Sequence, residues 1–458
     1  MTLSSLIGLD DLYGLGFHGS GVEIAVVDTG INGNHPDLVH GSGSASSFIV
    51  KDESFVPAHG YVDQDGHGTF IAGMLIGNGD SSSGAISGLA PQSNLWNLRV
   101  LDENGEGEES WTEAALDWII AQPTKPDILS LSFGSTSTMS SIEGKIKQLW
   151  DDGVFVVVAA GNEGPDYFTV DSPGNVLDVM TVGACTSDEY LLSFSSQGPT
   201  PGDYYYKPDV VAFGDQVTSL SLTSGYEDGS GTSFAVPFIT AGVALLEEAT
   251  GGAETPDAIK AAILDSCHSI GYSHFMEGAG LPDFDVALAL LQDPAWDGVA
   301  VLPENVSMPV EDNDATSHAT SLDDYMIKPT VILSKNTGTV HVEVEGASSG
   351  ATTAILEDYS GSGDRQFVVK VQVSKVSPAF GGGTLLVHVK YADDTIAATI
   401  TVQIAGTGPG IVPFITFIII VIALAGMILF FAVAYKKGAQ AMPRPQCEID
   451  GTCTPIGS

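Results

Sequence analysis

The stretch EIAVVDTG, residues 23–30, is a run of mainly apolar residues that ends in an acidic residue and a glycine. Such a short apolar run is typical of a strand that is buried on both faces of a sheet. Similar runs alternate with helical stretches throughout residues 1–295. The strand runs are Glu23–Val27, Val154–Ala159 and Val179–Val182, and the helical stretches include Glu113–Ile120 and Pro237–Glu248. This alternation predicts an α/β fold with a parallel sheet that is covered by helices on both faces.

The remaining chain divides into segments of different composition. Residues 296–329 contain Pro and Asp, show little periodicity and are interpreted as a linker. Residues 330–408 alternate apolar and polar residues between Gly-rich turns, which predicts a small β-sandwich that acts as a spacer. Residues 409–435 are predicted to form one transmembrane helix, and residues 436–458 a cytoplasmic tail.

The membrane prediction rests on Ile411–Ala434, which holds 24 residues without a charge. As a helix this segment would be about 36 Å long, enough to cross a hydrocarbon core of about 30 Å. Tyr435, Lys436 and Lys437 follow directly and are typical of a cytoplasmic end. We therefore expect a single-pass protein of the cell membrane with residues 1–408 outside. Residues 1–11 do not resemble a signal peptide, so we favour a targeting segment upstream of this chain; the alternative is a tail anchor with a cytoplasmic body.

The charge of the chain excludes one class of function. Lys and Arg total 16 against 57 Asp and Glu, which gives a net charge of −41. A basic face for nucleic acid is therefore not expected. Residues 1–295 carry 41 of the acidic residues and 7 of the basic ones. This excess is interpreted mainly as a solubility feature, and acidic loops that hold calcium are the alternative interpretation.

Three short segments place catalytic residue types next to glycines. They are Asp28 at the end of the first strand, His67 within DGHGT (residues 65–69), and Ser233 within GTSFAVP (residues 231–237). A serine hydroxyl is a weak nucleophile unless an adjacent imidazole accepts its proton and a carboxylate orients that imidazole. A serine at the start of a helix also lies where backbone N–H groups favour negative charge. These residue types therefore predict nucleophilic catalysis by serine.

The three segments resemble the signature blocks of the subtilisin-like serine proteases, the subtilases. The order Asp, His, Ser and the spacings of 39 and 166 residues suit that family. AAGNEG (residues 159–164) resembles the family's oxyanion segment, and SFG (residues 132–134) its substrate-binding strand. FSSQGP (residues 194–199) and KPDVVA (residues 207–212) resemble two further blocks. The resemblance covers about residues 5–292 and implies a subtilisin-like fold for residues 1–295.

The resemblance also implies roles for individual residues. Ser233 would be the nucleophile, His67 the general base and then acid, Asp28 the group that orients His67, and Asn162 the oxyanion donor together with the Ser233 N–H. Residues at three places would bind substrate, namely Ser132, Phe133 and Gly134, then Gly105, Glu106 and Gly107, and then Gly161. Phe70 and Phe234 replace a histidine and a methionine that are frequent in the family, which changes packing near the site but removes no catalytic group.

The resulting prediction is a membrane-anchored serine endopeptidase that acts on protein or peptide substrates. A non-catalytic binding module on the same scaffold and a processing protease of the kexin type are the alternatives. The resemblance implies structural calcium, although no metal ligands can be assigned. Residues 102–113 nearly fit an EF-hand loop, but the strand-like Leu95–Leu101 precedes them where an EF-hand has a helix. This acidic loop is interpreted instead as lining the outer substrate subsites, where it would favour cationic side chains.

Overall fold

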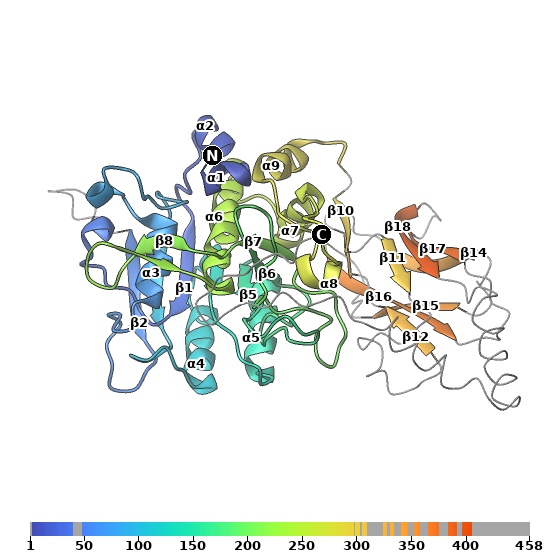
Figure 1. Ribbon diagram of the computed structural model, residues 1–458, viewed down its shortest axis with the longest axis horizontal. Coiled ribbons are helices and arrows are strands. Elements are labelled where there is room, and N and C mark those ends of the chain that lie inside the picture. The colour runs from blue at the N-terminus through green and yellow to red at the C-terminus, as the bar shows by residue number, and fades with distance from the viewer. Residues whose placement is uncertain are drawn as a thin grey trace, which may run out of the picture.

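The computed structural model describes most of residues 1–302 and short strand segments beyond them. The described ranges are 2–39, 48–296, 298–302, 305–308, 324–327, 330–333, 340–346, 352–357, 365–374, 383–391 and 396–404. The predicted membrane segment Ile411–Ala434 and the predicted tail, residues 436–458, lie outside these ranges. Figure 1 shows an α/β body joined to a region of strands.

A parallel sheet of seven strands forms the centre of the body, as the alternation of strands and helices predicts. Each strand pairs in parallel with its neighbours. In spatial order the strands are β2 (Ile49–Ser54), β3 (Asn94–Arg99), β1 (Glu23–Asp28), β4 (Ile128–Leu131), β5 (Phe155–Ala159), β6 (Met180–Cys185) and β7 (Val210–Phe213). Because all strands run in the same direction, their carboxyl ends meet at one edge of the sheet.

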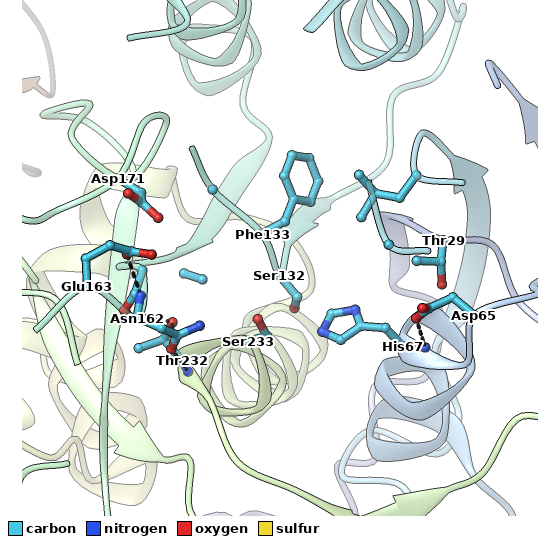
Figure 2. A pocket seen from close by; sticks show the side chains of 15 residues that line it. Thr29, Asp65, His67, Ser132, Phe133, Asn162, Glu163, Asp171, Thr232 and Ser233 are labelled. Carbon is cyan, nitrogen blue, oxygen red and sulfur yellow. Dashed lines mark hydrogen bonds between the residues drawn. The ribbon is translucent and has the colours of Figure 1, made fainter. Parts of the chain in front are cut away.

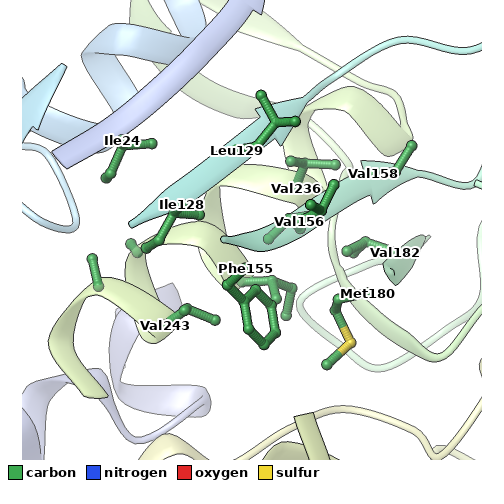
Figure 3. Packing of buried hydrophobic residues seen from close by; sticks show 14 of the residues in the cluster. Ile24, Ile128, Leu129, Phe155, Val156, Val158, Met180, Val182, Val236 and Val243 are labelled. Carbon is green, nitrogen blue, oxygen red and sulfur yellow. The ribbon is translucent and has the colours of Figure 1, made fainter. Parts of the chain in front are cut away.

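Helices cover both faces of the sheet (Figure 1). On one face α6 (Thr232–Thr250) packs against β4 to β7, and α3 (His67–Ile76) packs against β1 and α6. On the other face lie α4 (Glu109–Ile120) and α5 (Ser140–Asp151), of which α5 contacts β5. Val236 and Val243 of α6 lie among the buried side chains of the strands (Figure 3). The other helices of the body are α1 (Leu3–Leu6), α2 (Leu9–Leu15), α7 (Pro256–Ser266), α8 (His274–Glu277) and α9 (Phe284–Gln292).

Helix α6 begins earlier than its sequence suggests. Proline is favoured in the first turn of a helix, which is why the pattern places the start at Pro237, but the helix starts at Thr232 and Pro237 lies inside it. Among the described residues, α6 is also the helix that is long and apolar enough to cross a membrane. However, 78% of its most apolar stretch of 18 residues is buried inside the protein. Packing in the core therefore accounts for its apolar surface.

The C-terminal strands form two sheets that contact each other through β10 with β18 and β14 with β15. The first sheet holds β10 (Val299–Leu302), β13 (Thr330–Leu333), β16 (Arg365–Ser374), β12 (Asp324–Ile327) and β15 (Thr352–Glu357). The second holds β11 (Asn305–Met308), β18 (Ile396–Ile404), β17 (Gly383–Tyr391) and β14 (Val340–Gly346). The stretch 296–329, expected to be a linker, thus contributes three strands. Each has only four residues, too few to produce a clear alternating pattern.

The first of these sheets packs against the α/β body. Ala300 and Leu302 of β10 and Ile332 of β13 belong to the same hydrophobic core as the parallel sheet. The Gln366 side chain donates hydrogen bonds to the Asp178 carbonyl at 2.7 Å and to the Asp257 carboxylate at 2.9 Å. The β-region therefore shares an apolar core with the body.

A buried cluster of charges ties α7 to the sheet. Lys207 Nζ lies 2.6 Å from Asp209 Oδ2, and Lys260 Nζ lies 3.1 Å from Asp209 Oδ1. Both ammonium groups also donate hydrogen bonds to the Val179 carbonyl. Burial lowers the pKa of Lys207 to about 7, although the charge of Asp209 opposes this shift. Asp209 thus pairs with two fully buried lysines, and the charge of Asp178 also raises the pKa of Lys207.

Candidate active site

The carboxyl edge of the parallel sheet brings the predicted site residues together. Asp28 is the last residue of β1, and Ser132 follows β4. Gly161 and Asn162 follow shortly after β5. The register pairs β1 with β4 and β4 with β5, so these three strand ends are neighbours.

Asp28 and His67 form a hydrogen-bonded pair. His67 Nδ1 lies 2.8 Å from Asp28 Oδ1 and 3.0 Å from Asp28 Oδ2. The Asp28 side chain is 1% exposed and that of His67 is 24% exposed. A carboxylate only accepts hydrogen bonds, so the proton of the neutral imidazole lies on Nδ1. The Nε2 lone pair is then available as a base.

Glycine and a buried carboxylate bring the first turn of α3 against the end of β1. A Cβ on Gly68 would lie 2.1 Å from the Gly30 carbonyl oxygen, which excludes any side chain at this contact. Asp63 Oδ1 accepts hydrogen bonds from the Thr29 hydroxyl at 2.9 Å and the Gly66 N–H at 3.0 Å. Asp63 is also buried. Asp63 therefore positions His67 relative to the strand, and the sequence analysis did not identify it.

The surrounding charges change the basicity of His67. Burial by itself lowers the pKa of His67, since it disfavours the imidazolium. The charge and hydrogen bond of Asp28, together with the charges of Asp65 and Asp63, outweigh burial and raise this pKa above its ordinary value. The site therefore stabilises the imidazolium that forms when His67 accepts a proton.

Ser233 lies at the amino end of α6, where it is the second helical residue. The first four N–H groups of a helix have no acceptor within the helix, and they create a partial positive charge. Pro237 has no N–H, so it cannot bond the Ser233 carbonyl in the usual helical pattern. Figure 2 shows the Ser233 hydroxyl facing the His67 ring across the cavity. Ser233 and His67 line the same cavity, with the hydroxyl directed toward the imidazole ring.

Hydrogen bonds to Thr232 fix the orientation of the Asn162 side chain. Asn162 Oδ1 accepts hydrogen bonds from the Thr232 N–H at 3.0 Å and the Thr232 hydroxyl at 3.1 Å. Because an N–H can bond only to the oxygen of the amide, Nδ2 is the end that remains available as a donor. Asn162 and Ser233 line the same cavity. The amide can therefore donate to an oxyanion that forms next to Ser233.

Two phenylalanines support the imidazole. The Phe234 ring centroid lies 5.5 Å from that of His67 and 4.5 Å from that of Phe70. Phe70 is buried within α3. These are the positions where the chain departs from the residues frequent in the resembling family, and here they pack beside the site without replacing Asp28, His67 or Ser233.

The site opens into a cavity of about 290 Å³. Five of the predicted substrate-binding residues line it, namely Gly105, Ser132, Phe133, Gly134 and Gly161. Glu106 and Gly107 belong to the same loop as Gly105 but do not line it. Lining residues that the sequence analysis did not identify include Thr29, Asp65, Ala159, Glu163, Asp171 and Thr232. Glu163 belongs to the oxyanion segment at residues 159–164 and could have been found there, whereas Asp171 has no local signal.

The described residues contain no cluster of metal-ligating side chains. No group of three or more His, Cys, Asp or Glu side chains among them is arranged to hold a metal ion. Strand β3 precedes the acidic loop at 102–107, so the helix that an EF-hand requires is missing at this place. Asp102 Oδ1 instead accepts the N–H groups of Asn104 and Glu106, at 2.8 and 3.1 Å. Calcium can also bind backbone and amide oxygens, so the calcium expectation stays a prediction without an assigned ligand set.

Comparisons with known proteins agree on one family. Residues 19–281 match the model of the subtilase family. The chain is 37% identical over 275 residues to serine protease AprX of Bacillus subtilis, which covers 53% of this chain and 60% of AprX. It is 32% identical over 291 residues to human membrane-bound transcription factor site-1 protease, which covers 62% of this chain and 26% of that protein. The chain thus spans less than two thirds of either relative.

A solved structure and a further relative are also similar. The structure is that of a cold-adapted subtilisin-like serine proteinase, with a TM-score of 0.48 and 27% sequence identity over 58% of this chain and 88% of that one. Alkaline serine exoprotease A of Vibrio alginolyticus is 32% identical over 256 residues, which covers 56% of this chain and 44% of that protein.

Proposed function

The chain belongs to the subtilase family, and on this basis we propose that it is a serine endopeptidase that hydrolyses peptide bonds through an acyl-enzyme. The observation that carries the proposal is the arrangement at the carboxyl edge of the sheet. Asp28 holds Nδ1 of His67 at 2.8 Å, and the ring faces Ser233. Asn162 presents its Nδ2 group to the same cavity.

In the first half of the reaction, Ser233 Oγ attacks the carbonyl carbon of the substrate while its proton passes to His67 Nε2. The carbonyl electrons move to the oxygen, and the oxyanion accepts hydrogen bonds from Asn162 Nδ2 and the Ser233 N–H. Asp28 stabilises the imidazolium. The C–N bond then breaks, the leaving amine takes the proton from His67, and the acyl group remains on Ser233.

In the second half, water takes the place of the amine. His67 accepts a proton from the water as its oxygen attacks the acyl carbon, and the same donors stabilise the second oxyanion. The ester bond to Ser233 breaks, and His67 returns the proton to Oγ. The products are a carboxylic acid and the free enzyme.

Substrate would bind as an extended strand along residues 132–134. The segment follows β4 at the carboxyl edge, and peptide backbone that pairs with it would add a strand to the site. Gly105 would lie on the other side of the peptide, with Glu106 and Gly107 further along the loop. The exposed Glu106, Glu108 and Glu109 would favour cationic substrate residues in the outer subsites.

We place this peptidase at the cell membrane, with the catalytic region outside and residues 436–458 in the cytoplasm. The length of Ile411–Ala434 and the cations that follow it support this placement. The site-1 protease relatives are membrane-bound by name. Protease treatment of intact cells should remove residues 1–408 and spare an epitope tag on the tail. Loss of the tag under these conditions would contradict the orientation.

Calcium belongs to the proposal only as a structural ion that the family resemblance implies, and no catalytic step depends on it. Chelation should lower the melting temperature of the purified protein, and added calcium should restore it. A melting temperature that does not respond to chelation would contradict this part.

Labelling with a fluorophosphonate probe tests the catalytic proposal, because the probe reacts with a serine that a neighbouring base has activated. We expect the wild-type protein to be labelled, the His67→Ala variant to be labelled far more slowly, and the Ser233→Ala variant to remain unlabelled. Ser224→Ala is the matched control, since Ser224 lies in the turn between β8 (Val217–Leu220) and β9 (Tyr226–Gly229). A folded wild-type protein that takes up no label would favour the non-catalytic binding module.

A further inference from the structure

One end of the cavity is formed by two carboxylates that the mechanism does not use. Asp171 and Glu163 both line the cavity that contains Ser233 and His67. Figure 2 shows them on the side away from His67, with Ser233 in between. Asp171 is 6% exposed, and its Oδ1 atom is buried without a hydrogen-bond partner. A buried carboxylate oxygen without a donor is costly unless a ligand supplies one.

Two glycines allow these carboxylates to approach the cavity. A Cβ on Gly161 would lie 2.6 Å from both Asp171 Oδ2 and Glu163 Oε2. A Cβ on Gly134 would lie 2.7 Å from Asp171 Cβ. The two carboxylates therefore meet at Gly161. Gly134 follows β4 and Gly161 follows β5, and both line the cavity.

No cation of the described structure balances the pair. Among the described residues that line the cavity, His67 is the one that can carry a positive charge, and Asp28 already pairs with it. Glu163 Oε2 accepts hydrogen bonds from the Asn162 N–H at 2.7 Å and the Ser196 hydroxyl at 3.2 Å, both of which are neutral. Burial and the charge of Glu163 raise the pKa of Asp171 to about 8. A cation bound between the two carboxylates would favour the ionised form of both.

The position of the pair relative to the nucleophile identifies the substrate residue that reaches it. The attacked carbonyl must lie between Ser233 Oγ and Asn162 Nδ2. Residues 132–134, Ala159 and Gly161 line the same cavity as Ser233 and Asp171, so the side chain of this substrate residue would extend past them toward Asp171. We propose that this acidic end of the cavity binds the cationic side chain of a lysine or arginine, so that the endopeptidase cleaves on the carboxyl side of basic residues. This inference rests on the function proposed above and adds its substrate class.

The test uses two peptides that are identical except for the residue before the cleaved bond, arginine in one and citrulline in the other. Citrulline has nearly the same shape as arginine and no charge. A hydrogen bond to a charged group contributes about 1.5–3 kcal/mol, so the wild-type enzyme should favour arginine in kcat/KM by about 10- to 100-fold. Asp171→Asn should bring the ratio close to one by slowing cleavage of the arginine peptide, and Glu163→Gln should lower it less.

Several controls make the result decisive. Asp166→Asn removes an exposed carboxylate from the segment between Glu163 and Asp171. It should leave the arginine-to-citrulline ratio of kcat/KM unchanged. The citrulline peptide serves as an internal reference, because a misfolded variant loses activity on both peptides. If Asp171→Asn does not fold, Glu163→Gln and the wild-type ratio still decide the question.

Four outcomes would overturn the inference. The first two are equal cleavage of the two peptides by the wild-type enzyme and an unchanged arginine-to-citrulline ratio of kcat/KM in Asp171→Asn. The other two are a wild-type ratio that falls when calcium is added and the absence of any cleavage. Competition by calcium would mean that the carboxylates bind a metal ion instead of a side chain. Absence of cleavage together with absence of probe labelling would reject the proposed function itself, whereas labelling with equal cleavage would reject only the substrate class.

Discussion

Replacement of Asn162 by alanine removes one of the two proposed oxyanion donors and leaves the pair of Asp28 and His67 intact. The carbonyl oxygen of a substrate is neutral in the ground state and carries a negative charge in the tetrahedral intermediate. A donor at this place therefore acts mainly on the transition state. We expect Asn162→Ala to lower kcat and to leave KM nearly unchanged.

The magnitude follows from the geometry of the amide. Its oxygen is bonded to Thr232 at 3.0 Å, so Nδ2 is held in position and needs little reorganisation during the reaction. Loss of such a prearranged donor costs about 3–4 kcal/mol. At about 1.4 kcal/mol for each factor of ten, kcat should fall by about 10²- to 10³-fold.

Asn162→Asp is the matched variant. Aspartate keeps an oxygen that can accept the Thr232 N–H, but it replaces the donor by a second acceptor with a negative charge. It should therefore be at least as slow as Asn162→Ala. Steady-state kinetics with a fluorogenic peptide give kcat and KM for each variant, and thermal unfolding verifies that the variants are folded. An Asn162→Asp variant with near wild-type kcat, or an Asn162→Ala variant altered only in KM, would refute the donor role.

Three further predictions concern charge. Asp65→Asn should move the acidic limb of the pH dependence of kcat/KM to lower pH, because the charge of Asp65 helps to raise the pKa of His67 and the reaction requires the neutral imidazole. An acidic limb at the same pH or at higher pH would contradict this. Asp209→Asn removes the carboxylate that contacts both buried lysines and should lower the free energy of unfolding by about 3–5 kcal/mol, measured by denaturant titration of an inactivated protein. The KM for the arginine peptide should fall as the pH rises through about 8, where Asp171 beside Glu163 loses its proton, while the KM for the citrulline peptide stays flat.

Local patterns in the sequence were sufficient to predict the parallel sheet and an acidic residue at the end of its strand at 23–28, whereas the roles of the other residues at the carboxyl edge came from the family resemblance. The apolar run at residues 23–27 predicts a strand, and the structure has one at Glu23–Asp28. In the parallel sheet that strand end lies beside the end of β4, which in turn lies beside the end of β5. A short run of apolar residues and a following glycine are local features, so they can be read without knowledge of distant contacts.

Contacts between distant residues decided what the sequence alone could not. Helix α6 begins at Thr232 because the Thr232 N–H finds its acceptor in Asn162, 70 residues earlier. The strand at Val299–Leu302 forms by pairing with Thr330–Leu333. Asp171 reaches the cavity only because the chain returns past Gly161 after β5. Tertiary packing therefore determines where the helix starts and which charge lines the cavity, since both depend on groups that are far apart in the chain.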